Sequence, residues 1–442
     1  MTRRRGTAIV AVLWGLVITA LLVSTMQVWT MRMAMLGRDT HERIRARWAA
    51  RAGAESTIAR LAYHTANPVP GDAHALSTDL EAVHFGEIDG GRWIIQHRAG
   101  DATRPFAGPM DEHSKLNVNG PNRGYIDIMF GPLAWGVFAA IEDWIDEDDE
   151  PSEFGVEREY YLSLDSRYEP RNGPMQSVAE LELVAGIEPN DIRGEDFNLN
   201  ARLDPEEDDG DEILPWDDQS GSLDAGWSGR LTVRSQADGA TLSGQPRIWL
   251  MATDQAELIE RFDHFGLTLP EEKATWLVGQ GASMDFDPLS LVTALQEATT
   301  TGGQSEGGQE ANLTFSPDEV AIILSETSMK PAHRPDWGRM NLNTIPADTL
   351  YAMFEGSERF VDSLLALRAG RATGLVSPVD LWDLPGMDSS GMDQLLPMFG
   401  THSNVFTISS RGESAATGEM AEINLVVDRS TLPIRILEYR EN

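Results

Sequence analysis

The amino-acid sequence predicts an α+β protein whose first element is a long helix able to cross a membrane. The prediction rests first on a run without any charged residue, which lies between Arg5 and Arg32. This run is longer than the roughly 20 apolar residues that a helix needs to cross a bilayer. The prediction rests also on a helical pattern that continues past the run, and on short capped helices that recur in the remaining chain.

Three kinds of membrane segment could contain the uncharged run. A cleaved secretory signal has a short apolar core followed by small residues, whereas here the core is long and Gln27-Val-Trp-Thr-Met-Arg-Met33 follows it. A twin-arginine signal would explain Arg3 and Arg4, but the Gly6-Thr7 pair lacks the bulky apolar residues expected after them. A retained helix with its basic end in the cytoplasm agrees best with the arginine cluster.

The composition limits the partners of the remaining chain. The 442 residues include 70 acidic and 35 basic side chains, which give a net charge of −35. Such a surface favours cations as partners and disfavours nucleic acid. The absence of cysteine excludes disulfides, thiolate metal sites and cysteine nucleophiles.

Helical periodicity continues beyond the uncharged run to about residue 66. Apolar residues recur at helical spacing among arginines and glutamates, at Leu36, Ile44, Trp48, Ala52, Ile58 and Leu61. The helix is expected to end before Asn67-Pro-Val-Pro70. We favour one continuous helix, buried in the membrane at its start and amphipathic at its end. The alternative is a transmembrane helix followed by a separate surface helix.

This N-terminus resembles that of type IV pilins and pseudopilins, which have a basic leader, a glycine at the cleavage site and a long apolar helix. The resemblance implies cleavage by prepilin peptidase between Gly6 and Thr7, and methylation of the new terminus. Most of the family has glutamate at the fifth mature position, which here is Ala11. The physical reason proposed for that glutamate is that its buried carboxylate pairs with the terminal ammonium of a neighbouring subunit. The K subunit of the type II secretion pseudopilus typically lacks it, and a subunit at the end of the fibre has no such neighbour.

Motifs in the soluble region are similar to those of the general secretion pathway protein K family, the minor pseudopilin K of type II secretion systems. They follow in one order, as Ser114–Asn119, Ile141–Asp146, Pro151, Tyr160-Tyr161, Pro170–Ile187, Val405–Gly412, Ile423–Arg429 and Ile434–Arg440. The resemblance implies a pilin-like α/β domain into which a large, mostly helical region of helix-hairpin-helix or SAM-like units is inserted. The last three segments would be the closing strands.

Two patterns suggest an internal duplication. Ser177-x-x-Glu180 and Ser377-x-x-Asp380 each resemble a capping box and lead into a short apolar helix that ends near glycine. Lys115–Asn119 resembles Arg339–Asn343 and, more weakly, Arg247–Met251. Helical stretches are expected after the latter two, at 256–262, 274–279, 347–354 and 361–368.

These observations divide the chain into nine segments. We expect a prepilin-type leader at 1–6, the transmembrane part of the helix at 7–31, its amphipathic continuation at 32–66, pilin-like strands at 67–125, an inserted helical domain with an acidic calcium-type loop at 126–230, a second helical repeat unit at 231–295, a flexible linker at 296–312, a third helical repeat unit at 313–400 and C-terminal strands at 401–442.

The segment from Asp196 to Glu207 has the spacing of a calcium-binding loop. Oxygen-bearing residues stand at positions one, three, five, nine and twelve, and position seven offers a backbone carbonyl; these residues are Asp196, Asn198, Asn200, Asp204, Glu207 and, for the carbonyl, Arg202. Ala201 departs from the pattern, since the sharp turn at position six prefers glycine. The alternative interpretation is a solvated acidic loop. We expect calcium here.

A second acidic cluster, Asp143, Asp146 and Asp148, is a tentative calcium site to which the sequence assigns no ligand set. Enzyme motifs were sought among metalloprotease, phosphate-loop and nucleophile-elbow patterns, and none was found. We therefore expect no catalytic residue. Helix-hairpin-helix units can bind DNA, but Asp388 and Asp393 follow the hairpin Leu384–Met387, and their carboxylates would repel phosphate.

The resemblance to the K family implies the function. The protein would be a minor pseudopilin at the tip of the type II secretion pseudopilus, where it initiates or caps fibre assembly for protein export across the outer membrane. Its partners would be the minor pseudopilins I and J, then H and the major pseudopilin G, together with prepilin peptidase. It would sit in the inner membrane by a single pass, with a cytoplasmic N-terminus and a periplasmic body. The alternative is a membrane-anchored, calcium-dependent binding module unrelated to secretion.

Overall fold

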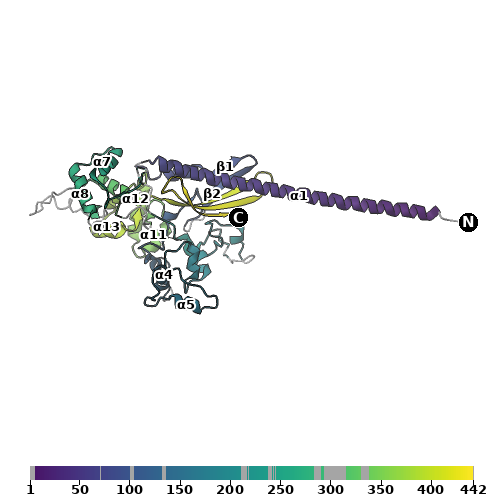
Figure 1. Cartoon of the computed structure of the whole chain (residues 1–442), viewed down its shortest axis with the longest axis horizontal. Helices are drawn as coiled ribbons and strands as arrows, with labels where there is room; N and C mark the ends of the chain where they lie inside the picture. Colours follow the sequence, from purple (N-terminus) through teal and green to yellow (C-terminus); the bar gives the residue numbers. More distant parts are fainter. Residues whose placement is uncertain are drawn as a thin grey trace, which may run out of the picture.

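One long helix projects from a body of strands and short helices (Figure 1). This computed structural model describes residues 5–69, 71–99, 104–131, 136–210, 217, 219–236, 241, 243, 245–282, 290–292, 315–329 and 338–441. The long helix, α1 (Arg5–Ala66), is continuous over 62 residues, so the continuous interpretation is confirmed and a separate surface helix is excluded. Among the described residues it is the one helix long and apolar enough to cross a membrane.

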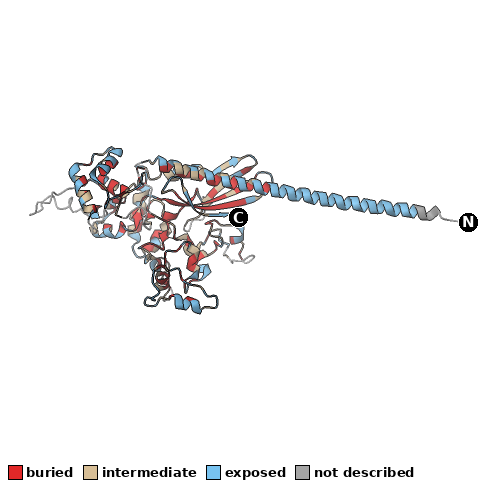
Figure 2. Ribbon diagram, in the orientation of Figure 1, coloured by how far each residue is buried: buried red, intermediate tan, exposed pale blue. Residues whose placement is uncertain are grey.

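The two halves of α1 have different surroundings. From Ile9 to His41 every residue is exposed, which Figure 2 shows as an unbroken pale-blue helix. From Glu42 onward buried residues recur at helical spacing, with Ala46, Ala50 and Leu61 fully buried. The helix ends where Asn67 precedes Pro68, because the residue before a proline is disfavoured in the helical conformation.

The buried half of α1 packs against a sheet of five antiparallel main strands. Their order is β1-β2-β11-β12-β13, and the bounds are β1 (Phe85–Ile88), β2 (Gly91–His97), β11 (Val405–Ser414), β12 (Met420–Asp428) and β13 (Arg435–Glu441). Two short strands extend the sheet, β3 (Phe106–Ala107) on β2 and β4 (Met110–Asp111) on β11. The sheet thus joins strands from both ends of the chain that follows α1, and helix α2 (Ala75–Ala82) precedes its first strand.

Small residues let α1 lie close to the sheet. A Cβ atom added at Gly412 of β11 would lie 2.0 Å from the Ala46 carbonyl oxygen, and one added at Gly53 of α1 would lie 2.5 Å from Trp93. The Ser410 hydroxyl donates to the Ala50 carbonyl across the same interface, at 2.8 Å. Glycine and alanine are therefore required here by the distance between helix and strand.

A mostly helical body is inserted between β4 and β11. Its described elements are η1 (Glu112–Ser114), β5 (Leu116–Asn117), α3 (Tyr125–Met129), α4 (Val137–Ile145), α5 (Arg158–Ser163), η2 (Val178–Leu183), α6 (Pro189–Arg193), η3 (Pro205–Glu207), η4 (Gly226–Gly229), β6 (Leu231–Thr232), β7 (Ile248–Trp249), α7 (Gln255–His264), α8 (Glu271–Gly281), α10 (Pro317–Glu326), β8 (Thr327–Ser328), β9 (Met340–Asn341), α11 (Ala347–Met353), α12 (Glu358–Gly370), η5 (Pro378–Asp383), α13 (Ser389–Leu395) and β10 (Phe399–Gly400). The body has its own apolar core, which includes Trp144, Tyr161 and Phe399, and a separate core lies between α1 and the sheet.

Each predicted repeat motif forms a short parallel pair of strands. β5 pairs with β6, β7 with β8, and β9 with β10. The first and third units also share a hydrogen-bond pattern. The Asn119 side chain exchanges two hydrogen bonds with the Met175 backbone, and Asn343 does the same with Leu375. This matching geometry supports the predicted duplication.

The capped segments after these motifs differ in detail from the prediction. Both are 3-10 helices rather than α-helices. Ser377 and Asp380 form a complete capping box. Glu180 instead accepts hydrogen bonds from Trp144, Arg171 and the Gln176 backbone, because those donors converge on its carboxylate. The four helical stretches expected in the second and third units fall in α7, α8, α11 and α12. The predicted linker at 296–312 lies outside the described residues.

Replacing Gly412 with valine should destabilise the sheet unit. The new side chain would overlap the backbone of α1, and overpacking of this kind costs about 1 to 3 kcal/mol or more. The measurement is the midpoint of chemical unfolding of the full chain in nanodiscs, followed by tryptophan fluorescence. Gly279→Ala in α8 is the matched control, since a Cβ there meets no atom within 4 Å. An unchanged midpoint for Gly412→Val would contradict the close approach described here.

Candidate metal centres and the anchor helix

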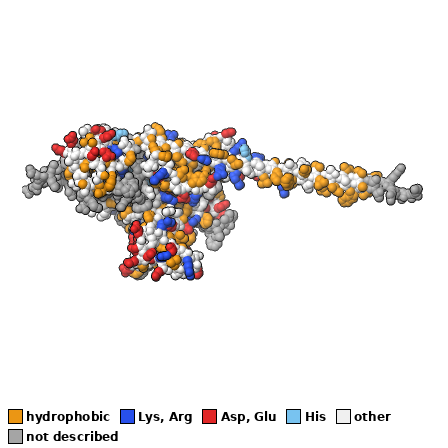
Figure 3. All heavy atoms as spheres, in the orientation of Figure 1, with side chains coloured by type: hydrophobic (Ala, Val, Ile, Leu, Met, Phe, Trp, Pro, Cys, Tyr) orange, Lys and Arg blue, Asp and Glu red, His pale blue; other side chains and the backbone are white. Residues whose placement is uncertain are grey.

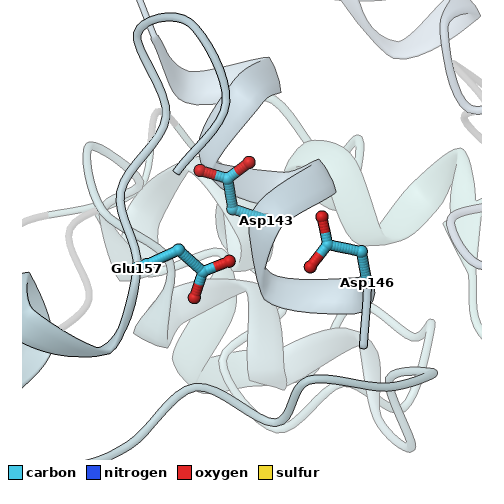
Figure 4. A group of neighbouring side chains, drawn as sticks. All are labelled: Asp143, Asp146 and Glu157. Carbon is cyan, nitrogen blue, oxygen red and sulfur yellow. The ribbon is translucent and has the colours of Figure 1, made fainter. Parts of the chain in front are cut away.

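Three carboxylates from separate turns converge beside α4 (Figure 4). Asp143 lies on α4, Asp146 ends that helix, and Glu157 precedes α5. One oxygen from each lies within 4.8 Å of the other two. Asp143 is 0% exposed and Glu157 5% exposed, so water reaches the cluster poorly. The end of α4 adds the negative pole of the helix, which also favours a cation.

Half of the six carboxylate oxygens of this cluster are buried without a hydrogen-bond donor. Both oxygens of Glu157 and Oδ1 of Asp146 are buried without a partner, while Asp143 accepts from the Ser152 backbone at 3.2 Å. Burial, reinforced by the charges of Asp143 and Asp146, raises the pKa of Glu157 to about 7. Burial and the charges of Asp148 and Asp143 also raise the pKa of Asp146. Three crowded carboxylates with unused lone pairs are suited to a hard cation such as calcium.

The sequence identified two members of this cluster and missed the third. Asp148, the predicted third residue, is exposed and accepts a hydrogen bond from the Glu150 backbone. Glu157 takes its place because the intervening loop folds back on α4 at Gly155. A Cβ at Gly155 would lie 2.0 Å from Oδ2 of Asp143, so glycine is required for this return. Gly155, two residues before Glu157, is the one sequence signal that could have suggested it.

The predicted calcium loop at 196–207 is closed by its own hydrogen bonds. The buried Asp196 carboxylate accepts from the backbones of Asn200 and Ala201, both at 2.9 Å. Glu207 accepts from the backbones of Phe197 at 3.1 Å and Asp204 at 3.0 Å. These contacts fold the segment into a compact loop.

The charges of this loop are distributed unevenly. Burial raises the pKa of Asp196 to about 6, and burial with the charges of Asp196 and Asp204 raises the pKa of Glu207 to about 7. Burial acts in the same direction on Asp204, but hydrogen bonding and charge from Arg411, with help from Asn198 and Asn200, lower its pKa. Arg411 therefore already supplies one positive charge to the loop.

The fit of the loop to calcium is weaker than that of the first cluster. Asn198 Oδ1 is buried without a partner and is available as a ligand, and so is a lone pair on each loop carboxylate. The side chain of Arg202, whose carbonyl was the predicted ligand, is buried with Nη1 unpartnered. Within the described ranges, Asp143, Asp146 and Glu157 are the one group of three or more carboxylates whose oxygens all lie within 4.8 Å of one another.

The loop also joins the helical body to the sheet. Asn200 donates to Glu422 of β12, Arg440 of β13 donates to the Asn198 carbonyl, and the Arg98 backbone donates to the Ala201 carbonyl. Its geometry therefore affects how the body is held, whether or not a cation is bound.

The processing residues lie at the tip of the anchor helix. Gly6 and Thr7 fall within α1, and their surroundings lie outside the described part. Ala11 lies on α1 and is exposed. Figure 3 shows hydrophobic side chains along the projecting part of α1, whereas acidic side chains gather on the lobe that carries α4 and α5.

The fold defines a class of protein in which one apolar helix, long enough to cross a bilayer, packs by its second half on an antiparallel sheet that carries a helical insertion. Residues 133–194 match the family model described as type II secretion system (T2SS), protein K. This segment includes all three residues of the first cluster, and the predicted resemblance to the K family is confirmed.

Two relatives named type II secretion system protein K match further residues. The one from Klebsiella pneumoniae is 29% identical over 201 residues, which is 42% of this chain and 59% of the relative. The one from Pectobacterium carotovorum subsp. carotovorum is 30% identical over 211 residues, 42% of this chain and 60% of the relative. The chain thus spans about 60% of the length of the curated relatives it matches.

A solved structure is also similar in outline. It is the crystal structure of the GspK-GspI-GspJ complex from the enterotoxigenic Escherichia coli type 2 secretion system, with 12% identity and a TM-score of 0.45. The match covers 92% of this chain and 99% of the other.

Calcium should stabilise the body most at neutral pH. Because the folded state raises the pKa of Glu157 from 4.5 to about 7, folding favours its protonated form. Without a cation, stability should therefore fall as pH rises from about 4.5 to about 7, by up to roughly 3 kcal/mol for this group. Melting curves of the full chain in nanodiscs, with calcium or with a chelator, at about pH 5 and about pH 8, test this.

Three variants separate the two candidate centres in that experiment. In the chelator, Glu157→Gln should remove the loss of stability with rising pH. It should also remove most of the rise in melting temperature that calcium produces. Glu207→Gln reports on the loop, and Glu150→Gln, an exposed acid in the same acidic run as Asp148, is the control. If calcium leaves the melting temperature of the parent protein unchanged at the higher pH, neither centre binds it.

Ala201→Gly should stabilise the loop. Ala201 has φ of 56°, a left-handed conformation that costs a residue with a Cβ atom about 1 to 2 kcal/mol. Glycine removes this cost but adds freedom to the unfolded chain, so a net gain of up to about 1 kcal/mol is expected. Unfolding of the full chain in denaturant measures it. Ala179→Gly is the control and should lower stability, since the first turn of η2 needs no positive φ.

Proposed function

We propose that this protein is a minor pseudopilin at the tip of the type II secretion pseudopilus, where it initiates or caps fibre assembly for protein export across the outer membrane. The observation that carries the proposal is α1, whose first half is apolar and exposed in the isolated chain while its second half is fixed to the sheet. Such a helix requires lipid or other apolar helices around it. The match of residues 133–194 to the protein K family model is the reason for proposing a role in type II secretion.

The proposed place at the tip rests on the anchor helix and on the size of the body. Ala11 offers no carboxylate to the terminal ammonium of a subunit above it. The inserted body reaches from residue 112 to residue 404 between strands β4 and β11, and a body of that size would obstruct the addition of a further subunit. By family resemblance, the helix would pack first against the minor pseudopilins I and J, with H and the major pseudopilin G below.

The proposed location follows from the same helix. Prepilin peptidase would cut between Gly6 and Thr7, and the new terminus would be methylated. The chain would then cross the inner membrane once, with the basic leader on the cytoplasmic side and the body in the periplasm. Calcium would bind at Asp143, Asp146 and Glu157, and the 196–207 loop is the second proposed position.

N-terminal sequencing of the membrane-extracted protein tests the processing step. In a host with active prepilin peptidase the mature chain should begin at Thr7, and in the same host without the peptidase it should keep Met1 or Thr2. Gly6→Leu should block cleavage, while Gly15→Ala, on the open face of α1, should not. An intact N-terminus in the active host would contradict the pseudopilin proposal and favour a membrane-anchored binding module.

A further inference from the structure

A cavity of about 670 Å³ lies where the sheet unit meets the third helical unit. Its walls come from the end of α1, from α2, from β3 and from the segments around β9 and Thr401. Cavities of this volume commonly hold a small organic ligand. None of the metal centres described above contributes a residue to it.

Arg429 brings an unpaired positive charge to this cavity. Its Nε donates to Thr65 at 3.1 Å, which fixes the guanidinium beside the end of α1. Its two terminal nitrogens make no hydrogen bond, and no carboxylate lies within 4.0 Å of them, among the residues described. Burial lowers the pKa of Arg429 to about 10, so the group remains charged at neutral pH.

Asp111, the acidic residue whose charge acts on Arg429, already accepts hydrogen bonds from other donors. Asp111 raises the pKa of Arg429, so it lies within electrostatic range. However, its oxygens accept from Ser403, from Thr344 and from the His113 backbone, all between 2.5 and 2.8 Å. The attraction is long-range, and the terminal nitrogens of Arg429 keep their hydrogen-bonding capacity.

His97, on the wall of the cavity, adds no charge at neutral pH. Burial lowers the pKa of His97 to about 4. His97 donates from Nδ1 to the Gly108 carbonyl at 3.0 Å and stacks on Phe106, with ring centroids 5.7 Å apart. His402 is exposed at the cavity and hydrogen-bonds Thr401. Both rings add polar surface to the cavity.

The remaining wall is largely apolar. Leu80 and Phe406 are buried behind it, and Phe106 is 51% exposed. Val69, Leu76 and Ile345 complete the apolar side. A ligand that fits must therefore combine one negative group for Arg429 with an apolar part for this wall.

We propose that this cavity binds a small organic carboxylate with an apolar body, whose carboxylate pairs with the terminal nitrogens of Arg429 while its apolar part contacts Phe106 and its neighbours. A carboxylate matches the two parallel donors of a guanidinium in a bidentate pair. The C-terminal residue of a peptide and a fatty acid share this chemistry. The site is independent of the pseudopilin proposal and of both metal centres.

Calorimetric titration of the full chain in nanodiscs tests the site, with empty nanodiscs as the blank. The probes are N-acetylphenylalanine for a peptide terminus and octanoate for a fatty acid, each with its uncharged primary amide. At least one carboxylate should bind with one site per chain, and its amide should bind at least about tenfold more weakly, since a charged hydrogen-bonded pair is lost. The carboxylate that binds identifies the source, and both results support the proposal.

Variants assign the binding to Arg429. Arg429→Gln should weaken the binding of the carboxylate at least about tenfold and leave the binding of the amide unchanged. Arg92→Gln, in an exposed ion pair on β2, is the control and should bind like the parent. If Arg429→Gln does not fold, the comparison of carboxylate with amide on the parent and on Phe106→Ala decides. Failure of both carboxylates to bind, equal binding of the amides, or unchanged binding by folded Arg429→Gln overturns the proposal.

Discussion

The close approach of α1 to β11 is the constraint on which the rest of the structure depends. Gly412 and Gly53 leave no room for side chains between helix and sheet, so the helix has one position and one direction on the strands. The apolar half must then project beyond the sheet, where the described part of the chain does not cover it. The direction in which the apolar half projects is thus determined by the packing of the other half of α1 on the sheet.

The same constraint explains how the inserted body is held. Strands from both ends of the chain that follows α1 must meet under this helix, so everything between β4 and β11 leaves and re-enters at neighbouring points. Polar contacts reinforce these points. Glu112, directly after β4, accepts hydrogen bonds from Thr232 of β6 and Thr407 of β11. Buried carboxylates that accept several hydrogen bonds give such a junction a specific geometry.

The sequence predicted those features that depend on residues close together in the chain. The single helix to residue 66 and the duplicated asparagine motifs follow from periodicity and spacing, and the structure contains both. Glu157 was missed because its place in the cluster depends on a loop that turns back on α4. The contacts of Glu180 were missed because Trp144 of α4 and Arg171 reach its carboxylate from outside η2. Such residues are brought together only by packing, which no spacing rule describes.

The acidic residues divide the molecule into two parts whose contributions to stability change with pH in opposite directions. Acids at the junction of α1 and the sheet are stabilised as anions: a hydrogen bond from Ser414 lowers the pKa of Glu42, and one from Arg47 lowers that of Glu441. Their contribution to stability is present at neutral pH and is lost on acidification. Glu157 and Glu207, in the helical body, have raised pKa values and so oppose folding at neutral pH unless a cation compensates them. A bound cation would therefore order the body without altering how the anchor helix is attached to the sheet.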